Sequence, residues 1–95
     1  MFTIIAERIN MTRKSIREKV RERNEDFIRN EASIQANAGA THIDINAGGD
    51  PAREIEDIIW LTRTVSDEVD LPLSFDSANP EAIRQALKSA TVPAL

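Results

Sequence analysis

One pattern recurs along the chain: a short apolar run, a few polar residues at its end, a residue able to cap a helix, and then a segment with helical periodicity. The apolar runs cover residues 2–6, 41–45 and 71–75, and each predicts a β-strand. The segments between them are long enough to form helices, so the strands should lie parallel and be joined by helical crossovers. The pattern therefore predicts an α/β architecture.

The first helical segment is the longest. Residues 12–38 have helical character, and Asn24 should divide them into two helices because its side chain can cap the second one. Gly39 should end that second helix, since glycine adopts left-handed backbone at little cost. We interpret the charged run at residues 13–29 as a solvated helix face.

The next two helices should begin with the same capping arrangement. Asp50-Pro51 and Asn79-Pro80 each combine a capping side chain with a proline at the first helical position. Residues 91–95 follow the last helix and have the composition of a fourth strand. We interpret the chain as the truncated beginning of a longer domain, because three strands alone leave two sheet edges unpaired.

Composition narrows the functional classes. The chain has 95 residues, of which 41% are hydrophobic and 29% charged, as is ordinary for globular proteins. Its net charge of −4 argues against nucleic-acid binding, which favours a basic surface. It has no cysteine, so disulfides and thiolate metal sites are excluded, and no apolar run approaches the ~20 residues of a membrane span. We expect a cytoplasmic protein that binds neither nucleic acid nor membrane, and the sequence shows no metal site.

Polar side chains gather where the predicted strands end. Because side chains alternate across a strand, Asp44 and Asn46 should share one face of the second strand, and Asp76 should lie on the same face of the third. Glu7 follows the first strand on the corresponding face. Ligands bind at the carboxyl ends of parallel strands, so we expect these groups to converge on one rim. For Asp76 a functional role is favoured, since Asn79 already supplies the helix cap.

Other polar residues have structural interpretations. A single histidine, His42, is more often packed than catalytic, and Trp60 suits a packing role. Gly48-Gly49 could hold an anion at a helix N-terminus, although a tight turn explains the two glycines better. No G-x-G-x-x-G follows the first strand, so a dinucleotide site is not indicated. From the strand pattern alone, a Rossmann or flavodoxin-like sheet stays open.

Three segments together resemble the pterin-binding methyltransferases. They are E-R-I-N at residues 7–10, G-A-T-H-I-D-I-N at residues 39–46 and F-D-S at residues 75–77. The resemblance covers essentially the whole chain, in order and at the family's spacing. The family includes methyltetrahydrofolate:corrinoid/iron–sulfur protein methyltransferase and the folate domain of cobalamin-dependent methionine synthase, with dihydropteroate synthase as a more distant relative.

The resemblance implies a (β/α)8 TIM barrel with a pterin pocket at the C-terminal mouth, of which residues 1–95 would form the first three strand–helix units. Asp76 matches the aspartate that holds the pterin ring. Asn46 and Asp44 match second-strand residues near the pterin. Glu7 and Asn10 match the first-strand motif, which shapes the site. The match at Asp76 makes chemical sense, because the aminopyrimidinone edge offers two neighbouring N–H donors that one carboxylate can accept.

The reaction that the resemblance implies is methyl transfer from 5-methyltetrahydrofolate to the cobalt of a corrinoid (cobalamin-type) cofactor, carried by a partner protein. N5 of the folate is a poor leaving group, so it must gain a proton or a hydrogen bond in the transition state. In the family an asparagine after the fourth strand makes that contact, beyond Leu95, so no catalytic residue is assigned here. We expect the 95 residues alone to bind folate weakly or not at all. The sequence leaves open whether the whole protein forms a homodimer.

Two other functions stay open. A dihydropteroate synthase-type enzyme would need phosphate-binding basic residues from later strands, and the E-R-x-N element favours the methyltransferase. A non-catalytic partial barrel or gene fragment is favoured by the end of the chain at Leu95. The sequence after Leu95 would discriminate, since a continuing reading frame with an Asn-Ser motif would restore the enzyme.

Overall fold

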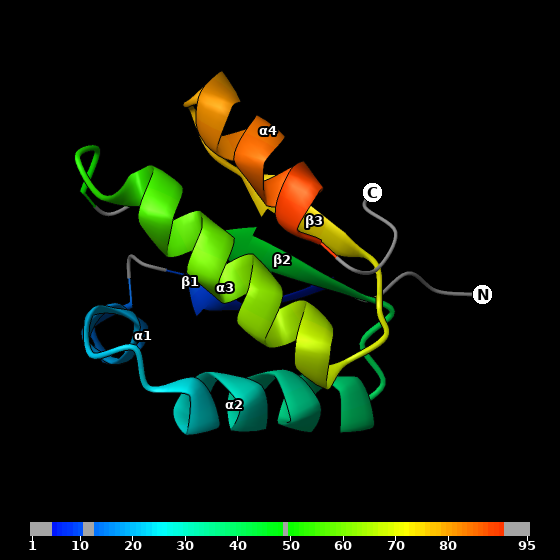
Figure 1. The fold of residues 1–95 in the computed structure, drawn as a ribbon. Helices are drawn as coiled ribbons and strands as arrows, with labels where there is room; N and C mark the ends of the chain where they lie inside the picture. The colour runs from blue at the N-terminus through cyan, green and yellow to red at the C-terminus, as the bar shows by residue number, and fades with distance from the viewer. Residues whose placement is uncertain (1–4, 11–12, 49, 91–95) are drawn as a thin grey trace.

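Three strands alternate with four helices in the computed structural model, which describes residues 5–10, 13–48 and 50–90, and only the backbone of residues 5–8 (Figure 1). The elements in chain order are β1 (Ile5–Asn10), α1 (Lys14–Arg21), α2 (Glu25–Asn37), β2 (His42–Asn46), α3 (Glu54–Glu68), β3 (Leu73–Asp76) and α4 (Pro80–Ser89). No helix within these ranges is both long and apolar enough to cross a membrane.

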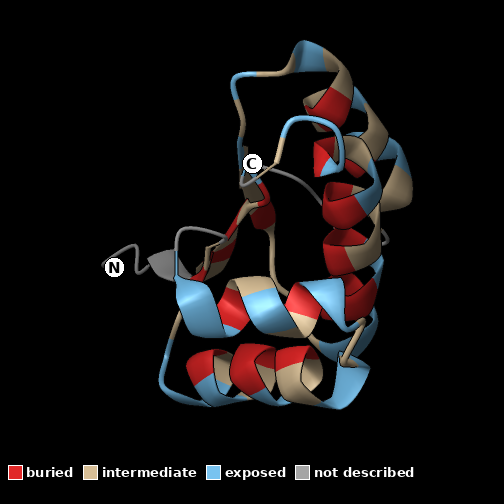
Figure 2. Ribbon diagram, turned by 90° about the vertical axis from the view of Figure 1, so that its left-hand side faces the viewer, coloured by how far each residue is buried: buried red, intermediate tan, exposed pale blue. Residues whose placement is uncertain are grey.

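The strands form one parallel sheet in the order β1-β2-β3. Figures 1 and 2 show the helices gathered on one side of this sheet. The order confirms the expected parallel α/β architecture and excludes the flavodoxin-like arrangement, in which β1 lies between β2 and β3. It suits the beginning of a barrel, although the first half of a Rossmann sheet has the same order.

The hydrophobic core lies between the sheet and the helices. Strand residues that are partners in a parallel pair share one face of the sheet, so the rows Ile9–Ile45–Phe75 and Ile43–Leu73 lie on the helix side. All of these except Phe75 are fully buried, and Phe75 packs against the cluster. The helices complete the core with fully buried side chains that include Ile16, Val20, Ile28, Ile58, Leu61 and Val65.

A β-bulge in β1 resets the alternation of its side chains. Between Ala6 and Ile9, β1 advances three residues while β2 advances two. As a result Ile9 is buried on the helix side, and Asn10 pairs with Asn46 on the opposite face. Strict alternation would have placed Asn10 with Ala6 on the helix side. The bulge therefore brings the first strand's terminal asparagine to the polar face.

Two expected strand boundaries were wrong by two residues or more. The E-R-I-N segment was expected beyond a strand at residues 2–6, yet β1 runs through residues 5–10, because the bulge accommodates polar residues within the ladder. The third strand begins at Leu73 rather than Leu71, and the carbonyl of Pro72 accepts a hydrogen bond from the Ile43 N–H at 3.1 Å. Residues 2–4 and the expected fourth strand at 91–95 lie outside the described residues.

Most of the expected helix ends are confirmed. Asn24 divides the first segment, since its Oδ1 accepts a hydrogen bond from the Phe27 N–H at 3.1 Å. Gly39 follows α2 with φ +98°, in the left-handed region that glycine adopts readily. Asn79 caps α4 by accepting from the Glu81 N–H at 3.0 Å, with Pro80 as the first helical residue.

The start of α3 was predicted too early. Asp50 Oδ1 accepts a hydrogen bond from the Ala52 N–H at 3.0 Å, and its carbonyl accepts from the Arg53 N–H at 2.9 Å. These bonds close a turn, and the helix begins at Glu54. Asp50-Pro51 is therefore a turn that precedes the helix, which begins three residues later than predicted.

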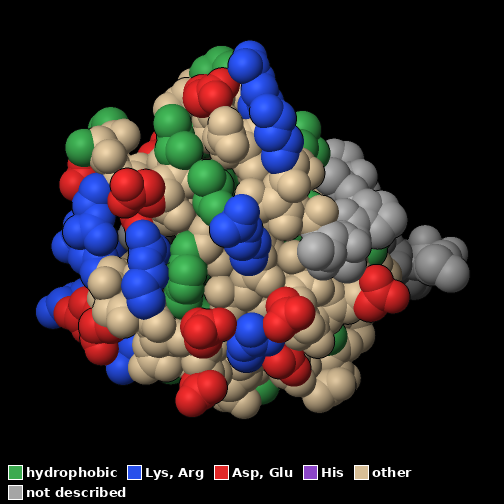
Figure 3. Space-filling view, viewed as in Figure 1, with side chains coloured by type: hydrophobic (Ala, Val, Ile, Leu, Met, Phe, Trp, Pro, Cys, Tyr) green, Lys and Arg blue, Asp and Glu red, His purple; other side chains and the backbone are tan. Residues whose placement is uncertain are grey.

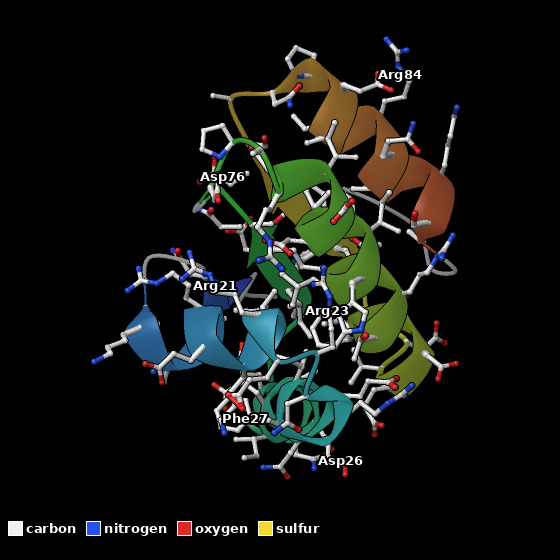
Figure 4. All side chains as sticks on the ribbon, turned by 60° about the vertical axis from the view of Figure 1, so that its left-hand side comes forward. Arg21, Arg23, Asp26, Phe27, Asp76 and Arg84 are labelled. Carbon is white, nitrogen blue, oxygen red and sulfur yellow. The ribbon has the colours of Figure 1, made fainter. Side chains whose placement is uncertain are left out.

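Arg23 departs from the expected solvated charge run. Its φ of +54° is in the left-handed region, and its guanidinium Nη1 lies 3.0 Å from Oδ1 of Asp57, whose side chain is 1% exposed. The guanidinium also lies 5.3 Å from the centre of the Trp60 ring, which packs against the core as expected. Figure 4 shows Arg23 between α1, α2 and α3. The Arg23–Asp57 ion pair, which is partly shielded from solvent, thus connects the corner between α1 and α2 to α3.

Candidate active site

Three polar residues form a row across the carboxyl ends of the strands. Asn10 is the register partner of Asn46, and Asn46 is the partner of Asp76. The Asn46 Nδ2 donates a hydrogen bond to Oδ2 of Asp76 at 3.3 Å. Asp76 is exposed at the end of β3, as Figure 4 shows. We call this row the rim, and it is where parallel α/β folds bind ligands.

The turn after β2 holds the Asn46 amide in one orientation. Its Oδ1 accepts a hydrogen bond from the Gly48 N–H at 3.0 Å. Because the carbonyl side of the amide is used by Gly48, the amino group is directed at Asp76. The Gly48 N–H is committed to Asn46, which favours the tight-turn interpretation over an anion cradle. Gly49 lies outside the described residues.

Asp44 lies on the same face as the rim but two residues earlier in β2. Its Oδ1 accepts a hydrogen bond from the Ser74 hydroxyl at 2.7 Å, and Ser74 is its register partner in β3. The polar residues expected on one rim therefore lie in two layers. Asn46 and Asp76 form the upper layer, and Asp44 and Ser74 form the layer beneath it. His42 lies two residues further down, where its Nδ1 is 2.8 Å from the Thr41 hydroxyl oxygen.

The expectation for Glu7 stays a prediction. Its backbone lies in the bulged segment of β1, between Ala6 and Ile9. Its side chain falls outside the described part of the structure. Asn10, which the same motif contributes, lies on the polar face because of the bulge, and its role in shaping the site stays a prediction.

Comparison with known proteins identifies the family. Residues 6–92 match the family of pterin binding enzymes. The chain belongs to the pterin-binding enzyme family. It is 37% identical over 92 residues to the methylcorrinoid:tetrahydrofolate methyltransferase of Eubacterium limosum. That alignment covers 97% of this chain and 34% of the relative, so the chain spans about a third of that protein.

One residue of this member of the pterin-binding enzyme family was missed by sequence reasoning. Glu54 begins α3, is 7% exposed, and accepts a hydrogen bond from the Ser77 hydroxyl directly after the rim. The Ser77 oxygen in turn accepts from the Asn79 N–H at 3.0 Å. The sequence offers three acids in the first turn of α3, and nothing in their spacing indicates which one turns toward β3.

A hollow of about 500 Å³ lies on the helical side of this chain, away from the rim, and includes Arg29, Trp60 and Arg63 in its lining. Arg29 lies 2.8 Å from Asp67, and hydrogen bonds to Asp67 and then Glu25 raise the pKa of its guanidinium. Figure 3 shows acidic and basic side chains intermixed over this face. Exposed ion pairs of this kind contribute little to stability, and the rim, not this hollow, carries residues of the three segments that resemble the family.

Proposed function

We propose that the whole protein transfers a methyl group between tetrahydrofolate and a corrinoid carried by a partner protein, and that residues 1–95 supply one wall of its pterin pocket. The printed name of the Eubacterium limosum relative contains both reactants. That name gives the direction from methylcorrinoid to folate, whereas the sequence resemblance implies the opposite one. Both directions share one transition state, so the same pocket serves either.

The observation that carries the proposal is the pairing of Asn46 with Asp76. The aminopyrimidinone edge of a pterin presents two adjacent N–H donors, and an ionised carboxylate can accept both in a fork. Asp76 is the exposed carboxylate of the rim, and Asn46 holds it from the side at 3.3 Å. In this proposal Asp76 binds the pterin ring and Asn46 fixes the orientation of the carboxylate.

The neighbouring polar groups complete the wall. Asn10 extends the rim across β1, and the Asp44–Ser74 hydrogen bond gives a polar layer beneath it. We assign Asp44, Asn10 and Glu7 to shaping the pocket. A carboxylate on an inner face needs donors to offset its desolvation, and the Ser74 hydroxyl supplies one to Asp44.

The chemical step itself is assigned to no residue of this chain. Forming or breaking the bond between the methyl group and N5 requires a proton to leave or reach N5. The rim residues described here bind and orient the ring, which brings N5 to a fixed position relative to the corrinoid. The proposal keeps the cytoplasmic location expected from the cysteine-free sequence.

A dihydropteroate synthase-type reaction would use a similar pterin pocket. The relative's printed name favours the methyltransferase, and the 37% identity extends over 97% of this chain. The two activities differ in the second substrate, so they can be separated by one set of assays.

The test uses the protein at its full natural length. It is mixed anaerobically with tetrahydrofolate and methylcobalamin, and 5-methyltetrahydrofolate is measured by chromatography while the cobalt spectrum is followed. We expect enzyme-dependent methyl transfer. Absence of transfer with either methylcobalamin or a methylated corrinoid protein, together with condensation of a pterin pyrophosphate with p-aminobenzoate, would favour the synthase instead.

A further inference from the structure

A chain of hydrogen bonds links α3 to the turn that follows Asp76. The Ser77 hydroxyl donates to Oε1 of Glu54, a residue of the preceding strand–helix unit. The Ser77 oxygen accepts from the Asn79 N–H at 3.0 Å, and Asn79 Oδ1 accepts from the Glu81 N–H at 3.0 Å. The β3–α4 turn is therefore connected at one end to Glu54 and at the other to the cap of α4.

Burial distinguishes Glu54 from Glu56 in the same helical turn, and its partner distinguishes it from Asp57, which is 1% exposed but lies against Arg23. Any acid there benefits from the positive end of the helix dipole, and Glu56 does so while exposed. Glu54 is instead 7% exposed, which removes its carboxylate from most of the solvent. A buried carboxylate is costly unless it accepts hydrogen bonds. Helix stability alone therefore does not account for its inward position.

The Glu54 carboxylate fixes the Ser77 hydroxyl because it can only accept. A hydroxyl has one proton, and once that proton points at Glu54 the oxygen lone pairs are left for the Asn79 N–H. The backbone directly after Asp76 is thereby held from two sides. Glu54 also lies close to the turn that follows Asn46. A Cβ atom built on Gly48, in that turn, would be 3.4 Å from Asn46 Oδ1 and 3.9 Å from Glu54 Oε1, so both side chains adjoin Gly48.

We infer that Glu54 is a positioning residue for the Asn46–Asp76 pair, acting through Ser77 and not by touching the pterin. The inference rests on the proposed function, because it gives Glu54 a part in folate affinity. It adds to that function a residue of α3, which contacts the turn after Asp76 and lies near the turn after Asn46.

The test compares four single variants of the full-length protein and the double variant Glu54→Ala/Ser77→Ala. Glu54→Ala removes the acceptor, Glu54→Gln keeps an oxygen in its place, Ser77→Ala removes the donor, and Glu56→Ala is the matched control in the same turn. Tetrahydrofolate affinity is measured by calorimetry, and amide hydrogen exchange is measured in peptides that cover residues 73–82.

We expect Glu54→Ala and Ser77→Ala each to weaken tetrahydrofolate binding about tenfold, as the loss of a hydrogen bond to a charged group does. The double variant should be no weaker than either single one, because both remove the same link. Glu54→Gln should restore most of the affinity, and Glu56→Ala should leave it unchanged. In Glu54→Ala, KM for the folate should rise with kcat retained, and exchange at residues 77–81 should be faster.

The two proposals fail separately. Wild-type protein that does not bind tetrahydrofolate would overturn the proposed function, and unchanged exchange in Glu54→Ala would then overturn the positioning role as well. Wild-type binding with equal affinities for Glu54→Ala and Glu56→Ala would overturn the inference alone. Additive losses in the Glu54 and Ser77 double variant would also overturn it, since the two residues would not act through one another.

Discussion

Asn46 and Asp76 are 30 residues apart in sequence and lie side by side in register, with the asparagine amide donating to the aspartate carboxylate at 3.3 Å. Their pairing depends on two strands that run in the same direction and end at the same level. A short exposed side chain is poorly oriented by itself, and this contact orients the Asp76 carboxylate before any ligand arrives. Preorganisation of this kind lowers the cost of binding.

Replacing Asp76 should remove the main pterin contact. Asp76→Asn keeps the size of the side chain but turns one acceptor oxygen into an N–H donor, which then faces a donor on the pterin. We expect tetrahydrofolate affinity in the full-length protein to fall at least about 100-fold, since one charge-assisted bond is lost and one donor is left unmatched. Calorimetric titration measures the loss.

Asp70→Asn is the matched control for that variant. Asp70 is exposed and precedes β3, so it lies at the opposite end of the strand from Asp76. The Asp70→Asn variant should bind tetrahydrofolate with the affinity of the wild type. Equal affinities for Asp76→Asn and the wild type would remove Asp76 from the pterin site.

A variant at Asn46 separates orientation from direct contact. Asn46→Asp keeps an oxygen for the Gly48 N–H but replaces the donor to Asp76 with a second acidic oxygen. Two negative charges at this distance repel each other, so we expect folate binding to weaken and to recover in part at high salt, which screens exposed charges. Affinities at low and high ionic strength provide the measurement. Binding that is as tight as in the wild type at low salt would show that the pair does not orient the site.

Local signals in the sequence predicted a large part of this arrangement. Asn24 and Asn79 cap helices because a short polar side chain before a helix accepts an orphan N–H, which is a property of neighbouring residues only. The shared face of Asn46 and Asp76 follows from side-chain alternation and the parallel direction of the strands. Both inferences need no knowledge of distant contacts.

The features that were not predictable depend on the packing of distant elements. The bulge before Ile9 arises from the register between β1 and β2, which the sequence of β1 does not specify by itself. The inward turn of Glu54 depends on where the turn at residues 50–53 ends, and a delay of three residues rotates the helix start. The contact between Arg23 and Asp57 joins residues from different helices, and only the packed structure selects that arginine from a run of charges.

The pair of Arg23 and Asp57 should matter more for stability than the other ion pairs. Asp57 is 1% exposed, and its Oδ1 receives no aligned hydrogen bond among the described residues, so the charge of Arg23 is its compensation. Arg23→Met should lower the free energy of unfolding by roughly 3 kcal/mol, near the low end for breaking a buried pair, because the Arg23 side chain is 33% exposed. Urea denaturation of the full-length protein measures the change.

Arg21→Met is the control for charge loss in that corner. Arg21 is exposed in the last turn of α1, and its replacement should change the free energy of unfolding by no more than about 0.5 kcal/mol. The double variant Arg23→Met/Asp57→Leu should recover part of the loss, because an apolar pair leaves no buried charge. Equal stabilities for Arg21→Met and Arg23→Met would show that Asp57 is compensated in another way.

The Asn24 cap separates α1 from α2. Asn24→Ala leaves the Phe27 N–H without its side-chain acceptor and should lower the free energy of unfolding by about 1 kcal/mol. Asn24→Ser should retain most of the stability, because a hydroxyl oxygen can accept the same bond. Asn30→Ala, at an exposed position inside α2, should be neutral or slightly stabilising since alanine has the higher helix propensity. If urea denaturation showed equal losses at positions 24 and 30, the capping bond would not be what separates the two helices.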